Sequence, residues 1–377
     1  MTARHIGIIV HDFSTGGSER IAIRLGNTWA KAGRRVTIYC GTEVGALRSL
    51  VGAQVELVCC DPPIKRSLMS RVRLGLRLSH AIKNDRPDVI FMPGNYHLLV
   101  VAVLARLHYT KRPLFICKLS NPVRSHSSPG VVVRLSEWFT RIAMAPVSAF
   151  TAMSPALREQ AVKVFPNHPI FDLAEPILDD DLLPLDATLH ADKAATIVCA
   201  GRLAPQKDFA LALRAFSTMD PALNVKLVIY GEGPLFESLT ALAAELKISE
   251  RVSFAGYVSD LRPYLAEAKL FLMTSIFEGY PAVLIEALAA GVPVVTTDCT
   301  PAMREIISSI ALGHIVKSRD PQKIALAIET RLKVHDASRE VRIAATQKHA
   351  IKAAAQAYLD CFDTLGRAAT SGSSQES

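Results

Sequence analysis

The sequence predicts an α/β protein with two doubly wound parallel sheets, each in a domain of its own. Short β-rich apolar runs alternate with longer segments of helical period almost throughout the chain. These runs are continuously apolar rather than alternating, which is typical of parallel strands buried on both faces. The chain has 377 residues, of which 50% are hydrophobic and 21% are charged. This length favours two domains, and this composition excludes a largely disordered chain.

Six apolar runs are the expected strands of the first domain, which we assign to residues 1–175. They lie at 6–10, 36–40, 55–59, 89–92, 114–118 and 147–153. Segments of helical period separate them, and in the first of these Ile21, Leu25 and Trp29 recur at helical spacing. A Ser-Pro pair at 154–155 predicts the start of another helix, because serine caps helices and proline suits their first position.

Prolines and the acidic cluster 179–181 interrupt this alternation, and we assign 176–193 to a linker. The alternation then restarts in a second domain, 194–345. Its expected strands lie at 196–200, 226–230, 252–255, 270–274 and 294–297, and its expected helices at 208–219, 235–247, 260–268 and 282–290. We expect a last helix at 346–366 and a disordered tail at 367–377. Ligands of doubly wound sheets bind beyond the carboxyl ends of the strands, so functional residues are expected in the strand-to-helix loops.

Several classes of protein are excluded by the apolar runs and the cysteines. The first apolar run, 6–10, is too short for the core of a signal peptide. No segment reaches the roughly 18 apolar residues that a membrane span needs. The seven cysteines show neither C-x-x-C spacing nor a His/Cys metal spacing. We therefore expect reduced core thiols in a cytoplasmic protein.

Positive charge is concentrated in the first half of the chain. Residues 1–180 carry 23 basic and 13 acidic side chains, whereas 181–377 carry 20 and 22. A positive surface attracts an anionic partner. We expect that partner to be an anionic membrane surface, because no nucleic-acid-binding motif or set of stacking aromatic residues is present.

Two segments of this basic half are candidates for membrane contact. In 65–83, Arg66, Arg73 and Arg77 are expected on one side of a helix, beside an apolar stripe. That stripe consists of Leu68, Val72 and Leu76. A basic amphipathic helix binds anionic membranes, and 134–141 adds a Trp-Phe pair. The alternative is an ordinary helix that packs its apolar stripe on the sheet and leaves the arginines in water.

The segment 274–295 contains two glutamates eight residues apart. A strand is expected to end near Thr274 and a helix to begin near Ala282, with Glu278 in the turn and Glu286 in the first turns of the helix. A helix N-terminus offers unpaired N–H groups and a positive dipole end, which suit a phosphate. Carboxylates on either side can accept hydrogen bonds from hydroxyl groups. The alternative is that Glu278 is a solvated turn residue and that Glu286 only interacts with the helix dipole.

This segment resembles the E-x7-E motif of family 4 retaining glycosyltransferases, including the E-G-x-P and E-A-x-A-x-G-x-P-V-V frame. The resemblance implies the GT-B fold, in which two Rossmann-like domains face each other across a cleft. It also implies that Glu278 lies by the donor sugar and that Glu286 holds the ribose hydroxyls of the nucleotide. Backbone groups around the sugar and diphosphate would come from Gly279, Tyr280, Ala282, Val283 and Leu284.

The segment 201–208 resembles the G-R-L-x-x-x-K element of the same family. The resemblance implies that Gly201 lies against the donor and that Arg202 and Lys207 grip its diphosphate. Breaking a sugar–phosphate bond builds negative charge on the leaving group, and preorganised cations stabilise that charge. The alternative is that Arg202 and Lys207 are ordinary surface residues near a helix start, although positive charge there opposes the helix dipole.

Three weaker resemblances extend the predicted donor site. Gly231 lies in a turn similar to the family's G-x-G-P turn. Tyr257 and Val258 lie in a segment similar to the one that lines the base pocket. Gly16 and Gly17 resemble a loop that approaches the donor phosphates from the other domain, although a Gly-Gly pair also occurs in ordinary loops.

The resemblance places the acceptor in the first domain, and the last helix is expected to cross back to that domain. Many relatives have a histidine after the fifth strand, where this sequence has Ser120 and Asn121. His97 and His126 are further candidates for contact with the acceptor. The absence of this histidine bears on which residue contacts the acceptor more than on the predicted sugar transfer. The departing phosphate oxygen can take the acceptor's proton, so transfer does not require a protein base.

The resemblance implies a retaining hexosyltransferase that moves a sugar from a nucleotide diphosphate sugar to a hydroxyl group. The expected acceptor is a lipid-linked or growing glycan in polysaccharide or glycolipid biosynthesis, at the inner face of a membrane. Neither a cofactor nor a metal is expected, because Arg202, Lys207 and the helix end supply positive charge. Two alternatives are a non-catalytic sugar-nucleotide-binding protein, which would tolerate losses at this site, and a nucleotide-sugar epimerase, which needs an acid/base pair that is not evident.

Overall fold

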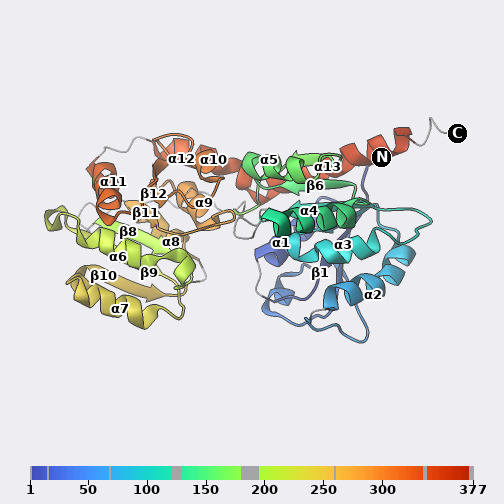
Figure 1. Ribbon diagram of the computed structural model, residues 1–377, viewed down its shortest axis with the longest axis horizontal. Helices are drawn as coiled ribbons and strands as arrows, with labels where there is room; N and C mark the ends of the chain where they lie inside the picture. Colours follow the sequence, from blue (N-terminus) through green and yellow to red (C-terminus); the bar gives the residue numbers. More distant parts are fainter. Residues whose placement is uncertain are drawn as a thin grey trace. The chain divides into compact units, whose positions relative to one another are not determined.

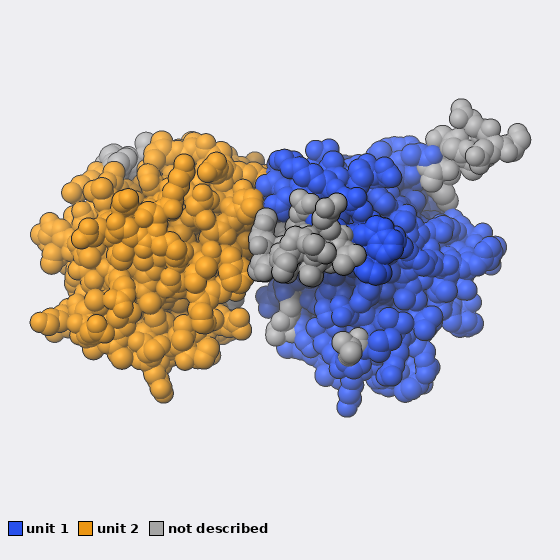
Figure 2. Space-filling model, in the orientation of Figure 1, with its two compact units in different colours: residues 1–176, 351–377 blue, residues 177–350 orange. Residues whose placement is uncertain are grey.

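The computed structural model describes residues 2–14, 17–67, 69–120, 130–179, 195–258, 260–333 and 338–372. The chain forms two compact units, coloured separately in Figure 2. Unit 1 consists of residues 1–176 and 351–377, and unit 2 of residues 177–350. Each unit contains one parallel sheet with helices packed on it (Figure 1).

The sheet of unit 1 has seven parallel strands in the order β3-β2-β1-β4-β5-β6-β7. The strands are β1 (His5–Val10), β2 (Arg35–Cys40), β3 (Glu56–Cys59), β4 (Val89–Met92), β5 (Leu114–Leu119), β6 (Ala149–Ala152) and β7 (Ile170–Asp172). β1 and β4 are buried along their whole length, as continuous apolar runs predict. The strand order reverses between these two strands, so their carboxyl ends mark the point where doubly wound sheets bind ligands.

Six helices belong to unit 1 in the described part of the chain. They are α1 (Gly17–Lys31), α2 (Ser70–Asp85), α3 (Leu98–Leu104), α4 (Gly130–Met144), α5 (Pro155–Val164) and α13 (Ile351–Gly372). The predicted start of α5 is confirmed, since Ser154 Oγ accepts the Leu157 N–H at 3.2 Å and Pro155 is the first helical residue. α2 packs against α3 and α3 against α4, so these three helices lie side by side (Figure 1).

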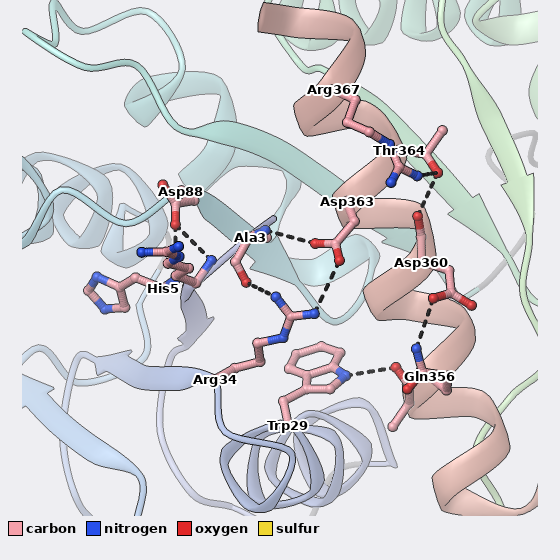
Figure 3. A network of polar contacts seen from close by, with 12 residues as sticks. Ala3, His5, Trp29, Arg34, Asp88, Gln356, Asp360, Asp363, Thr364 and Arg367 are labelled. Carbon is pink, nitrogen blue, oxygen red and sulfur yellow. Dashed lines mark hydrogen bonds and ion pairs between the residues drawn. The ribbon is translucent and has the colours of Figure 1, made fainter. Parts of the chain in front are cut away.

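The C-terminal helix α13 is fixed to unit 1 by hydrogen bonds and an ion pair (Figure 3). Trp29 Nε1 donates to the carbonyl oxygen of Ala355 at 3.0 Å. The Asp363 carboxylate accepts the Ala3 N–H at 2.7 Å and pairs with Arg34 at 3.1 Å. Aromatic side chains of the helix also enter the core of unit 1. The helix ends at Gly372, later than the sequence predicts.

The sheet of unit 2 has six parallel strands in the order β10-β9-β8-β11-β12-β13. The strands are β8 (Ala195–Ala200), β9 (Val225–Tyr230), β10 (Val252–Gly256), β11 (Leu270–Met273), β12 (Val294–Thr297) and β13 (Gly313–Val316). The helices are α6 (Phe209–Ser217), α7 (Phe236–Glu245), α8 (Arg262–Ala266), α9 (Ala282–Ala289), α10 (Met303–Ile306), α11 (Pro321–Lys333) and α12 (Arg339–Thr346). One core cluster includes α6, α7 and α11, and another includes α8, α9 and α10, as expected for a sheet covered on both faces.

Three details differ from the expectations. Two short strands, β7 and β13, were not anticipated from the sequence. The helix α2 begins at Ser70, so Arg66 lies in the preceding loop and not on the helix face shared with Arg73 and Arg77. The face of α2 that is buried carries Leu74, Leu78 and Ile82, whereas Leu76 is exposed.

The prediction that all seven cysteines are reduced thiols is wrong for one pair. Cys40 and Cys59 lie opposite each other on β2 and β3, and they form a disulfide with their Cα atoms 4.6 Å apart. The remaining cysteines are free and buried. Within the described ranges, no helix has both the length and the apolar character needed to cross a membrane.

Candidate functional site

The carboxyl ends of four neighbouring strands, β10, β9, β8 and β11, meet at one edge of the sheet in unit 2. Each strand leads into a loop with residues that the sequence predicts for the donor site. These are Gly201, Arg202 and Lys207 after β8, Gly231 after β9, Tyr257 and Val258 after β10, and Glu278, Gly279 and Tyr280 after β11. The parallel topology therefore brings segments that are far apart in the sequence to one edge.

Two of these loops approach each other so closely that only glycine fits. Gly201 and Gly231 have φ angles of 147° and 133°, which L side chains rarely adopt. A Cβ atom on Gly231 would lie 2.0 Å from the carbonyl oxygen of Gly201. The Gly201 N–H donates to the Tyr230 carbonyl at 2.9 Å, and the Gly231 N–H to the Gly256 carbonyl at 2.7 Å. The backbone itself forms this part of the edge.

Lys207 and Glu278 form an ion pair at this edge. Lys207 ends the 3-10 turn η3 (Pro205–Lys207), and its Nζ lies 2.6 Å from Glu278 Oε1. Ser275 Oγ donates to the same carboxylate oxygen at 2.7 Å. The side chains of Lys207 and Glu278 are 21% and 9% exposed, so the pair is partly shielded from water. Each charge thus fixes the position of the other.

The loop that carries Glu278 is held by its neighbours. The Glu278 N–H donates to the Cys299 carbonyl at 3.0 Å, and Thr300 Oγ1 donates to the Gly279 carbonyl at 3.0 Å. Gln206 Nε2 donates to the Phe277 carbonyl at 3.0 Å. Burial raises the pKa of the Cys299 thiol to about 12, and the Glu278 charge acts in the same direction. Cys299 is therefore a neutral structural neighbour of the loop rather than a nucleophile.

The helix α9 begins directly after this loop, as predicted. Pro281 is the N-cap residue of the helix, and among the described residues no side-chain cap hydrogen bond is made to its first turn. The positive end of the helix dipole is therefore not offset by a capping side chain. Ala282 is exposed and Val283 half-buried, while Leu284 packs into the core. Glu286 follows one turn later and is half-buried.

Arg202 and Tyr257 are exposed members of the predicted donor site. Tyr257 is 68% exposed. Arg202 is exposed, and among the residues described no hydrogen bond or ion pair holds its guanidinium. Val258 and Tyr280 pack against the core cluster that contains α9. The geometry thus offers an anion one unpaired guanidinium, a Lys-Glu pair and an uncapped helix end.

The residues predicted for the acceptor side belong to unit 1, as does the Gly-Gly pair predicted to approach the donor phosphates. Gly17 is the first residue of α1. The Ser120 N–H donates to Asn95 Oδ1 at 2.8 Å, which joins the loops after β5 and β4. His97 is fully buried at the start of α3, so its ring is not at the surface. Gly16, Asn121 and His126 lie outside the described residues, as do Asp180 and Asp181 of the acidic cluster.

A polar cluster missed by the sequence analysis lies at the carboxyl ends of β1 and β4. Arg66 donates to both oxygens of Asp12, at 2.5 and 2.9 Å, and lies 3.4 Å from Glu19. Burial by itself raises the Asp12 pKa, but hydrogen bonds from Arg66 and Ser14 outweigh it and leave that pKa well below its ordinary value. Arg66 is therefore paired within unit 1, in the loop before α2 and not on the helix face where the sequence predicts it.

Two buried histidines border this cluster. His11 Nδ1 lies 3.3 Å from Asp12 Oδ2. Burial lowers the pKa of His97 to about 3, and the charges of His11 and Arg66 act in the same direction. Neither ring nitrogen of His97 has a hydrogen-bond partner within the described part of the chain. Burial also lowers the pKa of His11 and outweighs the opposite effect of Asp12, so both rings are neutral near pH 7.

Arg319 is a further residue at the edge of unit 2 that the sequence analysis missed. It follows β13, a strand that was not anticipated, and it contacts the loops on which Lys207 and Glu278 lie. Recognition of residues 313–316 as a strand would have placed Arg319 at the same sheet edge. Among the described residues, no group of three His, Cys, Asp or Glu side chains has the geometry of a metal site.

Two family models together match most of the chain. The glycosyl transferase 4-like domain matches residues 16–170, and glycosyl transferases group 1 matches residues 185–349. The chain belongs to this family of glycosyltransferases. The predicted family is thereby confirmed, as is the prediction that the protein is a glycosyltransferase.

Two relatives match this glycosyltransferase over most of their length. The N-acetylgalactosamine-N,N'-diacetylbacillosaminyl-diphospho-undecaprenol 4-alpha-N-acetylgalactosaminyltransferase of Campylobacter jejuni is 24% identical over 344 residues, 87% of this chain and 90% of the relative. The lipopolysaccharide core biosynthesis glycosyltransferase LpsE of Rhizobium meliloti is 26% identical over 301 residues, 76% of this chain and 77% of LpsE.

Solved structures confirm the predicted GT-B fold of this glycosyltransferase. The lipopolysaccharide outer core galactosyltransferase WaaB has a TM-score of 0.72 and 18% identity, over 94% of this chain and 98% of WaaB. Anabaena HepE in complex with UDP-glucose has a TM-score of 0.67 and 19% identity, over 98% of this chain and 99% of HepE.

Proposed function

We propose that this glycosyltransferase transfers a sugar from a nucleotide diphosphate sugar to a hydroxyl acceptor, with retention of the anomeric configuration. The observation that carries the proposal is the Lys207–Glu278 pair, which lies at the sheet edge where the uncapped helix α9 begins. A helix end and nearby cations are the features that bind a diphosphate. The proposal places Glu278 by the sugar and Glu286 by the ribose.

The chemistry that these residues support is stabilisation of the leaving group. The bond between the sugar C1 and the diphosphate oxygen breaks, and a bond between C1 and the acceptor oxygen forms. The acceptor proton passes to the departing phosphate oxygen, so no protein base is needed. Arg202, Lys207 and the N–H groups at the start of α9 stabilise the charge that develops on the diphosphate. Because these groups supply the positive charge, we propose that transfer needs no divalent metal.

A lipid-linked or growing glycan is the acceptor class that we propose. The name of the Campylobacter jejuni relative specifies a diphospho-undecaprenol substrate, and LpsE is named for the lipopolysaccharide core. An enzyme that binds to the membrane surface reaches such an acceptor directly. We therefore propose peripheral binding of unit 1 at the cytoplasmic face of a membrane.

The helices α2, α3 and α4 form the surface that we propose for membrane binding. Their exposed side chains include bulky apolar groups, with Trp138 at 55% and Phe139 at 62% exposure. Leu76, Leu99 and Ile142 are also exposed on these helices. Arg73 and Arg77 on α2 and Arg141 on α4 are exposed as well. Aromatic and basic side chains on neighbouring helices are the combination that binds an anionic bilayer interface.

A thermal-shift screen of UDP-, GDP- and ADP-sugars tests the donor site directly. A ligand at 100-fold over its dissociation constant should stabilise the folded chain by about 2.7 kcal/mol. We expect one nucleotide class to raise the melting temperature and the K207A/E278A double variant to abolish that rise. If no nucleotide sugar and no nucleoside diphosphate raises it, the donor-site assignment is wrong.

Activity assays on the same purified protein distinguish the proposed transfer from the two alternatives. Transfer of labelled sugar to a polyprenyl-diphosphate-linked acceptor supports a transferase. Donor binding without transfer or hydrolysis favours a non-catalytic binding protein. Conversion of the donor to its epimer favours an epimerase, although no acid/base pair is evident among the described residues at this edge.

A further inference from the structure

We propose that Arg319 is a positioning residue for transfer, and that it fixes the two loops on which Lys207 and Glu278 lie. This inference rests on the proposed function, because it gives a role to a residue that touches the site only through its neighbours. Arg319 lies between β13 and α11, at one end of the strand order of unit 2. None of the motifs that resemble the family includes it.

The guanidinium of Arg319 joins two loops that follow different strands. Its Nη1 donates to the carbonyl oxygen of Ser275 at 3.1 Å, and its Nη2 donates to that of Thr274 at 3.0 Å. The same Nη2 pairs with the carboxylate of Asp208. Thr274 and Ser275 follow β11, whereas Asp208 lies between η3 and α6. One planar group therefore connects the loop after β8 with the loop after β11.

These contacts lie next to both members of the ion pair. Asp208 directly follows Lys207, and Ser275 Oγ donates to Glu278 Oε1 at 2.7 Å. Thr274 Oγ1 donates to the carbonyl oxygen of Asp208 at 2.9 Å, which is a further link between the loops. Loss of the guanidinium removes three of the contacts that set the loop spacing. A small misplacement of Lys207 relative to the donor is then expected to slow transfer, since catalysis is sensitive to distance.

Arg319 also offsets a negative charge at an edge that has to bind an anion. The Asp208 carboxylate caps α6, since its Oδ1 accepts the Leu211 N–H at 3.2 Å. Its Oδ2 faces the guanidinium. Without Arg319, this carboxylate would stand uncompensated beside Lys207 and repel a diphosphate. The arginine therefore has two separable effects, one on loop spacing and one on local charge.

An arginine suits this role better than a lysine. Its planar group presents several N–H donors in a fixed fork, and here two nitrogens reach three acceptors. A lysine keeps the positive charge near Asp208 but offers a single nitrogen on a flexible stem. R319K should therefore retain the charge effect and lose the spacing effect.

Steady-state kinetics of donor use separate these two effects. We expect R319A to lower kcat by about 10²-fold, the cost of a displacement of about 1 Å, and also to raise the donor KM. R319K should lower kcat while it leaves the donor KM near the wild-type value. In R319A/D208N, where the uncompensated carboxylate is gone, the donor KM should return toward wild type while kcat stays low. Asparagine keeps the helix cap and tolerates the left-handed backbone of Asp208, whose φ is 43°.

Chemical rescue and a matched control complete the test. Millimolar guanidinium, well below denaturing concentrations, should restore part of the R319A turnover, whereas methylammonium should not. R214A, which removes an exposed arginine from α6, should behave like wild type. Wild-type turnover of R319A, or a loss that guanidinium does not rescue and that follows the melting temperature, would overturn the inference. Failure of the wild-type chain itself to bind or use any nucleotide sugar would instead overturn the proposed function.

Discussion

Lys207 and Glu278, which lie in loops after different strands, meet in an ion pair 2.6 Å long at the edge of the unit 2 sheet. Since each charge holds the other in place, removal of either one leaves its partner unpaired and misplaced. We expect K207M and E278Q each to lower kcat/KM by about 10²–10³-fold. The double variant should be little worse than either single variant, because residues in contact do not act additively. Losses that multiply in the double variant would show that the pair does not act as a unit.

Glu286 is expected to act on donor binding rather than on the chemical step. It lies one turn into α9, on the helix whose first turn lacks a side-chain cap. A hydrogen bond between a carboxylate and a ribose hydroxyl contributes about 1.5–3 kcal/mol, so E286Q should weaken nucleotide binding by about 10–100-fold. Isothermal titration with the nucleoside diphosphate measures this effect, and E245Q, on the exposed end of α7, is the control. Unchanged binding by E286Q would remove Glu286 from the site.

The buried histidines of unit 1 should make the chain less stable in mild acid. The pKa of His97 is about 3 in the folded chain, against an ordinary value of 6.5. The unfolded chain therefore takes up a proton below pH 6.5 that the folded chain does not, so stability falls as the pH falls from 6.5 toward 3. Between pH 7.5 and pH 5, one such histidine contributes a loss of about 2 kcal/mol.

Urea unfolding of His97→Gln at the two pH values tests this contribution. The variant should lose less stability on acidification than the wild type. His11, whose pKa burial also lowers, accounts for part of the dependence that remains. H108Q replaces an exposed histidine and should keep the full wild-type dependence. An identical pH dependence in H97Q would show that His97 can be protonated in the folded chain.

Asp363 should stabilise the attachment of α13 to unit 1. Its carboxylate accepts the Ala3 N–H and pairs with Arg34, and both side chains of the pair are mostly buried. D363A leaves these two donors without their acceptor, which should cost about 1–3 kcal/mol in the unfolding of unit 1. D360A removes an exposed carboxylate from the same helix and should cost less than about 0.5 kcal/mol. Equal losses in the two variants would contradict this role for Asp363.

Binding of unit 1 to anionic vesicles should depend on α2 and α4 together. R73Q/R77Q removes two exposed basic groups, each worth about 1 kcal/mol near an anionic surface, and should weaken co-sedimentation in a salt-sensitive manner. W138A/F139A should weaken it with little change in the salt dependence. K226Q, on an exposed position of unit 2, should have no effect. Unchanged sedimentation of both double variants would show that this surface does not bind membranes.

The sequence was sufficient to predict the long apolar strands and the loops after them. Glu278 and Ala282 lie in the turn and at the helix start where the strand–turn–helix pattern predicts them. The strands β7 and β13 were missed because they are short, and because prolines or a histidine interrupt the apolar pattern there. The omission of β13 also hid Arg319, since only the sheet order brings its loop beside those of Lys207 and Glu278.

Pairings between distant segments were beyond the reach of sequence periodicity. Arg66 has the spacing of a helical residue, yet Asp12 draws its guanidinium into a contact across 54 positions. Cys40 and Cys59 become neighbours through the register of β2 and β3, which the sequence does not state. The Lys207–Glu278 contact likewise depends on tertiary structure, although each residue was predicted for the site separately.

Product stereochemistry tests the central claim most directly. The wild-type chain is supplied with an α-linked nucleotide sugar and a polyprenyl-diphosphate-linked acceptor, and the anomeric signal of the new linkage is followed by NMR. We predict an α-linked product that forms without added metal and in the presence of EDTA, and a loss of product with E278A. A β-linked product, or undiminished transfer by E278A, would contradict the account.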